Sequence, residues 1–213
     1  MRPVSVAAEA RSGRGFTLVE AMVTLAVFAT LLAVGVPRMV DWVAATKAAA
    51  ATEFYAEGFS LARAKALAHN SASRLVLAEN AVSGQYDWRV DLCFPTPDAP
   101  CNDEAGEWST LDDAVRPAQD AGAGVKSVAR SADALPGTDR LTVTPGPGED
   151  LEVYFTPLGW VDTSVGTRMM RVDLAAAGGD GAVFPSTSIV LTLAGVAAKC
   201  HPAAPAGDSR RCP

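Results

Sequence analysis

The apolar residues divide the chain into a strongly hydrophobic N-terminal stretch and a remainder of mixed character. Phe16–Val36 contains a single charged side chain, Glu20. As a helix rising about 1.5 Å per residue, this stretch reaches about 31 Å, which matches a bilayer hydrocarbon core of ~30 Å. The pattern therefore predicts a helix that spans a membrane.

The helical pattern continues after Pro37 through an alanine-rich stretch and ends at Asn70-Ser71. We expect one helix of roughly fifty residues, with a kink at Pro37 because proline removes a helix hydrogen bond. Lys47, Glu53 and Glu57 interrupt one side of this helix. The apolar stripe on the other side is predicted to face a sheet and to hold Val43, Ala50, Phe54, Leu61 and Ala68, with Gly58 beside them.

After residue 70 the apolar positions alternate with polar ones, as they do in strands. Tyr86–Phe94 alternates strictly, with Asp87, Arg89, Asp91 and Cys93 on the polar side, which predicts an antiparallel strand with one buried face. The chain is therefore expected to be α+β, with the long helix packed under an antiparallel β-sheet. Further strands, separated by glycine and proline, are expected at Arg74–Leu77, Val125–Val128, Leu141–Val143, Leu151–Phe155, Met169–Leu174, Ser188–Leu193 and Val196–Cys200.

The segment before the apolar stretch carries three arginines, Arg2, Arg11 and Arg14, against Glu9. A positive flank stays on the cytoplasmic side, so the remainder of the chain is expected to be exported. An ordinary secretory signal has a small-residue cleavage site after its apolar region, and none follows here. The expected organisation is a leader at 1–15, a membrane helix at 16–36, a helix continuation at 37–70 and a β-rich domain at 71–213.

Glu20 is unusual because a carboxylate within an apolar span costs roughly 2.5–3.5 kcal/mol at the bilayer centre. Its position near the cytoplasmic end offers one explanation, in which the side chain extends toward the headgroups. The alternative is that the carboxylate pairs with a positive group of a neighbouring subunit after assembly. If the Gly15–Phe16 bond is cut, the new amine of Phe16 lies one helical turn from Glu20, and the same amine of a neighbouring subunit would supply such a group.

The run Gly15-Phe16-Thr17-Leu18-Val19-Glu20, between a basic leader and an apolar stretch that ends at Pro37, resembles the prepilin signature of type IV pilins and type II secretion pseudopilins. The resemblance implies cleavage after Gly15 by prepilin peptidase, methylation of the Phe16 amine, and use of Glu20 for subunit register. It also implies a single-pass protein of the bacterial inner membrane, with its C-terminal domain in the periplasm. The implied partners are other major and minor pilins or pseudopilins and the inner-membrane assembly platform.

Further stretches are similar to the GspH/FimT family within this group. They are the helix end Leu61–Ala68 leading into Arg74–Leu77, Trp88, the Phe155-Thr156-Pro157-Leu158-Gly159 turn, and Ile189–Gly195. The resemblance implies a minor pilin or pseudopilin that helps initiate or cap a filament. It leaves open whether that filament is a type IV pilus or a secretion pseudopilus.

The four cysteines, Cys93, Cys101, Cys200 and Cys212, all lie in the predicted exported domain. An even number in an oxidising compartment predicts two disulfides, for which three connectivities exist. Local pairing, Cys93 with Cys101 and Cys200 with Cys212, would fasten the proline-rich segment 95–100 and the C-terminal tail. Zinc held by Cys200, His201 and Cys212 is the rival hypothesis, although no CxxC pair is present.

The formal net charge of −6 excludes a nucleic-acid-binding surface over the whole protein. The tail is nevertheless locally basic, and some FimT-like pilins bind DNA through a tail resembling G-R-x-R. The corresponding stretch here, Gly207–Cys212, contains two adjacent arginines and an aspartate, so it departs from that motif. The candidate DNA contacts are therefore Lys199, Arg210 and Arg211, and the alternative is a solvated tail with no ligand.

Seven carboxylates lie in the segment Asp98–Asp120, without the D-x-[DN]-x-[DN]-G pattern of a calcium loop. A solvated acidic loop is the favoured interpretation, with calcium as the alternative. Common hydrolase, nucleotide-binding and metalloprotease motifs are missing from the sequence. The sequence therefore predicts no cofactor, no catalytic residue and no enzymatic activity.

Overall fold

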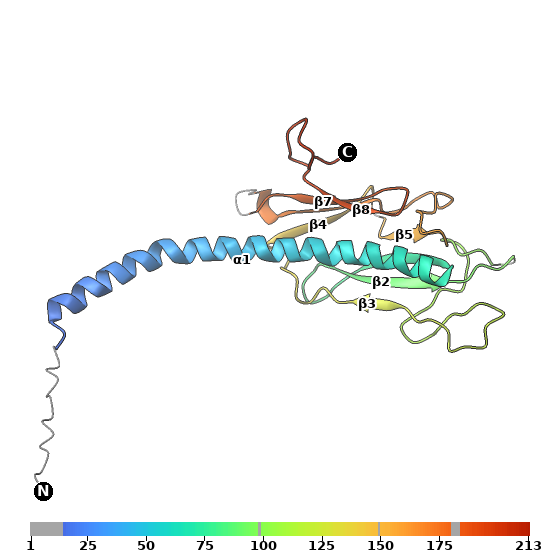
Figure 1. The fold of residues 1–213 in the computed structure, drawn as a ribbon, viewed down its shortest axis with the longest axis horizontal. Coiled ribbons are helices and arrows are strands. Elements are labelled where there is room, and N and C mark those ends of the chain that lie inside the picture. The colour runs from blue at the N-terminus through green and yellow to red at the C-terminus, as the bar shows by residue number, and fades with distance from the viewer. Residues whose placement is uncertain (1–14, 98, 149, 180–183) are drawn as a thin grey trace, which may run out of the picture. The chain divides into compact units, whose positions relative to one another are not determined.

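The computed structural model describes residues 15–97, 99–148, 150–179 and 184–213 (Figure 1). The long helix α1, Leu18–His69, is followed by eight strands and a short 3-10 helix, η1, at Ala177–Gly179. The chain divides into two compact units, 1–42 and 43–213, and helix α1 contributes to both. Within this helix, Pro37 is an interior residue. The kink expected at Pro37 stays a prediction.

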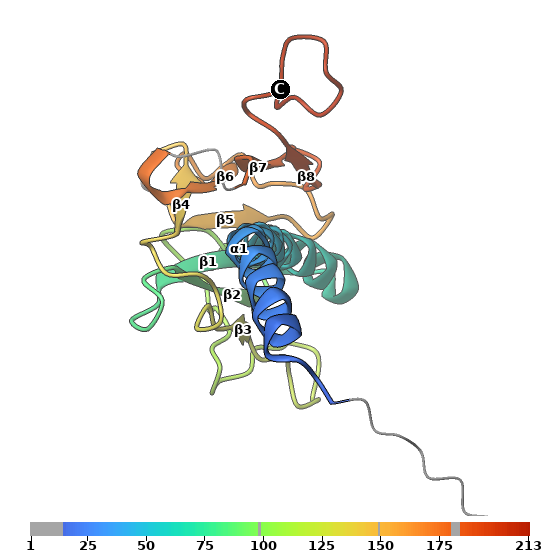
Figure 2. The same ribbon diagram turned by 90° about the vertical axis from the view of Figure 1, so that its left-hand side faces the viewer.

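The outer unit, 43–213, contains two antiparallel four-stranded sheets instead of the single sheet that the sequence pattern suggested. In Figure 2, strands β1–β3 of the first sheet lie below strands β6–β8 of the second sheet, and the helix lies beside both sheets. The first sheet has the order β3-β2-β1-β5 and the second the order β4-β6-β7-β8. The strands are β1 Ala72–Glu79, β2 Tyr86–Cys93, β3 Val128–Arg130, β4 Leu141–Gly146, β5 Glu152–Phe155, β6 Arg171–Ala176, β7 Thr187–Leu191 and β8 Ala197–Cys200.

The helix packs into the core through small residues as well as through the large side chains of Phe54, Tyr55 and Phe59. Ala51, Ala62 and Ala66 are fully buried, and Gly58 lies against Leu75 and Trp88. Where the side chains are small, the helix backbone approaches the strands closely, and larger residues of both the helix and the sheets fill the rest of the core. The core cluster draws on both sheets, because Leu75 of β1 and Ile189 of β7 belong to it.

The predicted apolar stripe was partly wrong. Phe54 and Gly58 are buried as expected, but Val43, Ala50 and Ala68 are exposed and Leu61 is half-buried. The face that packs is rotated toward a set of positions centred on Tyr55 and Phe59. Because alanine occurs on every side of this helix, hydropathy alone does not distinguish the buried face from the exposed one.

Strand β2 is buried on both faces, whereas the sequence pattern predicted one. Trp88 and Val90 belong to the core cluster, as expected, but Asp91 and Cys93 on the other face are also buried. The connection between β2 and β3 covers this second face: Ser127 donates its hydroxyl to Asp91 at 2.7 Å, and Trp108 packs on the cluster that contains Cys93. The strand expected at Val125–Val128 begins later, at Val128, and Val125 instead forms an isolated bridge with Val115.

Candidate functional site

The N-terminal end of helix α1 carries the predicted processing residues. Gly15, Phe16 and Thr17 precede the helix, and the side chain of Phe16 is 77% exposed. Thr17 caps the helix, because its Oγ1 accepts the backbone N–H of Glu20 at 3.2 Å. The carbonyl of Thr17 accepts the N–H of Ala21 at 3.1 Å. The predicted scissile bond, Gly15–Phe16, therefore lies just outside the helix, and residues 1–14 of the predicted leader lie outside the described residues.

The cap at Thr17 was not among the predicted features, although the sequence contains a signal for it. Thr17-x-x-Glu20 matches the S/T-x-x-E pattern that precedes an apolar run at helix starts. In the structure the threonine side chain makes its capping hydrogen bond, in which Thr17 Oγ1 accepts the backbone N–H of Glu20. Glu20 is thereby placed in the first turn of the helix, where the positive end of the helix dipole favours a carboxylate. Within the described residues, the Glu20 carboxylate has no ion-pair partner.

Helix α1 presents a mostly apolar surface over its first half, interrupted by polar side chains such as Glu20, Thr24 and Thr30. It is the one helix among the described residues that is long and apolar enough to cross a membrane. Burial of each large apolar side chain contributes about 1.5–3 kcal/mol, so this surface favours lipid or other chains over water. The large side chains, each at least half exposed, are Phe16, Leu18, Val19, Met22, Val23, Leu25, Val27, Phe28, Leu31, Leu32, Val34 and Val36.

The C-terminal tail contains the second set of predicted residues, the candidate DNA contacts. Lys199 forms an ion pair with Glu53 of helix α1. Arg210 binds Asp208 through two nitrogens, at 3.1 and 2.8 Å. These bonds lower the pKa of Asp208 to about 2 and raise that of Arg210. Among the three candidate contacts, Arg211 is the one whose side chain has no partner in the described part of the chain.

A disulfide joins Cys200 to Cys212 and holds the tail against the end of β8. The backbone N–H of His201 donates to the carbonyl of Arg210 at 2.7 Å, and His201 forms an isolated β-bridge with Arg211. The second disulfide joins Cys93 to Cys101. Of the three possible connectivities, the structure therefore has the one in which each cysteine pairs with its neighbour in the sequence. Because Cys200 and Cys212 are bonded to each other, neither thiol is available for the rival zinc site.

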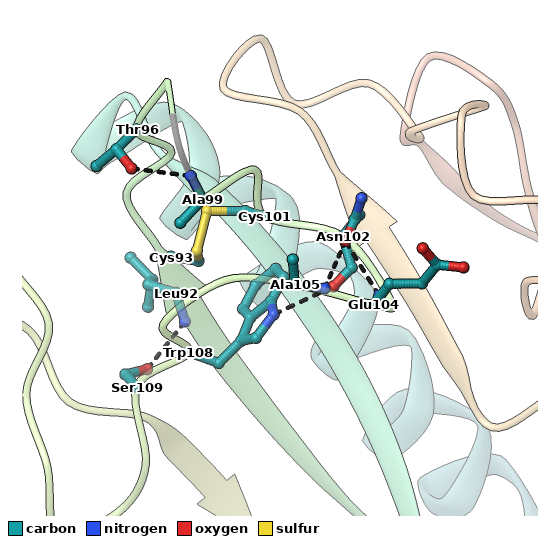
Figure 3. Close-up of a disulfide and its surroundings, with 10 residues drawn as sticks. All are labelled: Leu92, Cys93, Thr96, Ala99, Cys101, Asn102, Glu104, Ala105, Trp108 and Ser109. Carbon is teal, nitrogen blue, oxygen red and sulfur yellow. Dashed lines mark hydrogen bonds between the residues drawn. A yellow bond between two sulfur atoms is a disulfide. The ribbon is translucent and has the colours of Figure 1, made fainter.

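The Cys93–Cys101 disulfide lies in a small apolar cluster on the outer face of the first sheet (Figure 3). Cys93, Cys101 and Ala72 are buried there, and Trp108 packs against them. The indole nitrogen of Trp108 donates to the carbonyl of Asn102 at 3.3 Å. The disulfide thus fastens the segment after β2 to the first sheet. Trp108, from the same connection, packs over the end of β2 at Cys93.

The carboxylate of Asp91, which the alternating pattern placed on the polar face of its strand, is buried beside this cluster. The side chain of Asp91 is fully buried and forms ion pairs with Arg74 at 3.0 Å and with Arg89 at 2.7 Å. Ser127 donates its hydroxyl to the same carboxylate at 2.7 Å. The guanidinium of Arg74 also lies over the ring of Trp108, 4.6 Å from its centroid. Two cations and a hydroxyl compensate the buried charge, so this cluster holds the β2–β3 connection in place.

The acidic segment 98–120 lies mostly at the surface. Asp98 lies outside the described residues, while Asp103, Glu104, Glu107, Asp112, Asp113 and Asp120 are exposed. The described residues contain no group of three or more His, Cys, Asp or Glu side chains placed to hold a metal ion. The calcium alternative therefore gains no support from the arrangement of these carboxylates.

Comparison with known families finds one match, to the Prokaryotic N-terminal methylation motif, over residues 11–36. No significant match was found among curated proteins or among solved structures. The matched segment includes the exposed residues Gly15 and Phe16, the cap at Thr17 and the apolar part of helix α1. The motif and the apolar helix together indicate a membrane-anchored precursor of the type IV pilin-like or pseudopilin kind.

Proposed function

We propose that this chain is a minor pilin or pseudopilin of the GspH/FimT type, a structural subunit that helps initiate or cap a filament. The observation that carries the proposal is the methylation motif, which lies in register with an apolar helix exposed along its whole first half. Prepilin peptidase would cleave between Gly15 and Phe16, and methylation would modify the new amine of Phe16.

The apolar helix has two environments in this proposal. Before assembly, Phe16–Val36 resides in the inner membrane, where its side chains contact lipid. In the filament the same side chains pack against the helices of neighbouring subunits, and the Glu20 carboxylate neutralises a neighbour's Phe16 amine. An ion pair formed as the helix leaves the lipid would offset the cost of burying either charge alone.

The residues that carry the GspH/FimT resemblance lie where the helix meets the sheets. Trp88 lies against Gly58, where the helix meets the first sheet. Gly159, in the Phe155–Gly159 turn, has a positive φ of 71° and lies against Leu67 near the end of the helix. Arg63 donates to the carbonyl of Gly159 at 3.2 Å. These residues dock the helix on the sheets, which is the contact that any subunit of this architecture needs.

The proposed location is the inner membrane, with one membrane pass and the outer unit in the periplasm. Two disulfides among the described residues agree with an oxidising compartment. The proposed partners are prepilin peptidase, other pilins or pseudopilins and the assembly platform. The proposal is structural and assigns the chain no enzymatic activity, and the ion pairs of Lys199 and Arg210 give the DNA-binding alternative no support.

Expression of the full chain in a bacterium that has a prepilin peptidase and a pilus or pseudopilus tests this proposal. We expect the intact mass to correspond to a chain that begins at methylated Phe16 and is found in sheared filaments. Glu20→Ala should be processed and stay in the membrane, but should enter filaments poorly. Thr24→Ala, one turn further along the helix, is the matched control and should enter normally. A chain that keeps its leader would overturn the processing step, and normal incorporation of Glu20→Ala would overturn the assembly role.

A further inference from the structure

We propose that Thr17 is a positioning residue for cleavage of the Gly15–Phe16 bond. Its side chain fixes the residue at which helix α1 begins. The scissile bond is thereby kept in non-helical chain, separated from the helix by Phe16 and Thr17. This inference rests on the proposed function, because it concerns how the chain presents itself to prepilin peptidase. It adds a role for a side chain that does not take part in the reaction.

The hydrogen bond of the Thr17 side chain marks the start of helix α1. Gly15, Phe16 and Thr17 have no regular secondary structure, and helix α1 begins at Leu18. The Thr17 hydroxyl accepts the N–H of Glu20, which would otherwise be an unpaired donor of the first helical turn. Because unpaired backbone groups are costly where water is scarce, this bond favours a helix that starts at Leu18.

Other side chains that could cap the helix are scarce near Thr17. Ser, Thr, Asp and Asn are the N-cap residues whose side chains accept a backbone N–H, and between Gly13 and Val23 only Thr17 belongs to this group. Without the hydroxyl, the helix start is free to move along the apolar run or toward Phe16. The position of the helix start relative to the scissile bond would then vary from molecule to molecule.

Hydrolysis of a peptide bond requires access to its carbonyl carbon. Water adds across the Gly15–Phe16 bond, which breaks to leave a carboxylate on Gly15 and an amine on Phe16. A peptidase must reach the carbonyl carbon of Gly15, and exposed irregular chain allows this far better than a hydrogen-bonded helix. Exposure of Gly15 and Phe16 beside a capped helix therefore favours cleavage at this bond.

The test is a time course of leader removal from the full chain in lipid with a prepilin peptidase, read as the ratio of precursor to mature mass. Thr17→Val keeps the shape of threonine but removes the hydroxyl, and it should slow cleavage by about three- to tenfold. Thr17→Ser and Thr17→Asn can still cap, so both should be cleaved at close to the wild-type rate. Thr24→Val is the matched control, because the Thr24 hydroxyl donates to the carbonyls of Glu20 and Ala21 inside the helix.

Hydrogen exchange at the Glu20 amide supplies a readout that does not depend on cleavage. It should be faster in Thr17→Val than in the wild type and unchanged in Thr17→Ser. Cleavage of Thr17→Val at the wild-type rate would overturn the inference. Slow cleavage of all three Thr17 variants would also overturn it, since the peptidase would then be recognising the threonine itself. A wild-type chain that is not cleaved at all would instead refute the proposed function.

Discussion

Gly58 of helix α1 lies directly against the indole of Trp88 on strand β2. A Cβ atom at Gly58 would come within 3.2 Å of the Trp88 ring and within 3.1 Å of Leu75. Trp88 is 2% exposed and Leu75 is 1% exposed, so neither side chain has free space into which it can move. The close approach of the helix to the first sheet therefore depends on the missing side chain at position 58.

Replacement of Gly58 by valine should destabilise the outer unit by about 2 kcal/mol or more, because the added methyl groups overpack this contact. Ala64→Val is the matched control: Ala64 is exposed on the same helix, so the change should cost only the helix propensity of valine, less than about 1 kcal/mol. Urea unfolding followed by circular dichroism measures both. Equal stability of the two variants would show that the contact between Gly58 and Trp88 does not determine the packing distance.

The outer unit should lose stability in alkali between pH 10 and about 12. Burial raises the pKa of Tyr55 to about 12, and burial together with a hydrogen bond to Glu152 raises that of Tyr154 to about 12. A raised pKa in the folded state stabilises the fold below the unfolded pKa of 10, and this contribution disappears as the pH rises through 12. Absorbance at 295 nm should show two phenols that titrate late or only on unfolding.

Tyr55→Phe separates the two phenols. This variant should be less stable at neutral pH by about 1–2 kcal/mol, because the Tyr55 hydroxyl bonds both the carbonyl and the N–H of Tyr86. Its stability should then fall less steeply between pH 10 and 12 than that of the wild type. An unchanged slope would mean that Tyr55 titrates normally in the folded state.

The C-terminal tail should loosen in acid at an unusually low pH. Bonds from Arg210 lower the pKa of Asp208 from 3.8 to about 2. A lowered pKa in the folded state stabilises the tail above about pH 4, and this contribution is lost as the pH falls through 2. Carbon NMR of the Asp208 carboxylate gives its pKa directly. In Arg210→Ala the pKa should move back toward 3.8, whereas Arg211→Ala should leave it unchanged.

Removal of either disulfide should destabilise the outer unit by about 2–3 kcal/mol, the value for closing loops of this length. Replacing Cys93 and Cys101 by serine should cost more than the same change at Cys200 and Cys212. The reason is that Cys93 is 1% exposed and packs with Trp108, so serine would place hydroxyls in an apolar cluster. Thermal unfolding of the two double variants compares them, and an equal loss would show that loop closure alone determines the cost.

DNA binding should be weak in the wild type and should increase when Arg210 is released. Asp208→Asn removes the carboxylate that binds Arg210, which leaves Arg210 and Arg211 both able to contact phosphate. The full chain in detergent, titrated with labelled duplex DNA at low and physiological salt, measures this. Tight binding by the wild type that is lost in Arg210→Ala/Arg211→Ala would favour the DNA-uptake alternative.

The pattern of apolar residues determined the helix almost completely. The expected end at Asn70-Ser71 agrees with the observed end at His69, where Asn70 adopts a positive φ of 47°. Most strands also lie within a few residues of their expected positions. Local features were sufficient in these cases, because helix formers, alternation and turn residues act over short stretches of chain.

Tertiary structure alone decided which face of the helix packs and how the strands divide between sheets. Alanine is compatible with both a buried and an exposed position, so the choice between Ala50 and Ala51 depends on the side chains across from them. The burial of Asp91 is a similar case: its charge is compensated by Arg74, Arg89 and Ser127, and two of these are distant in the sequence. A sequence specifies its short-range preferences directly, whereas contacts between distant residues exist only once the chain has folded and brought them together.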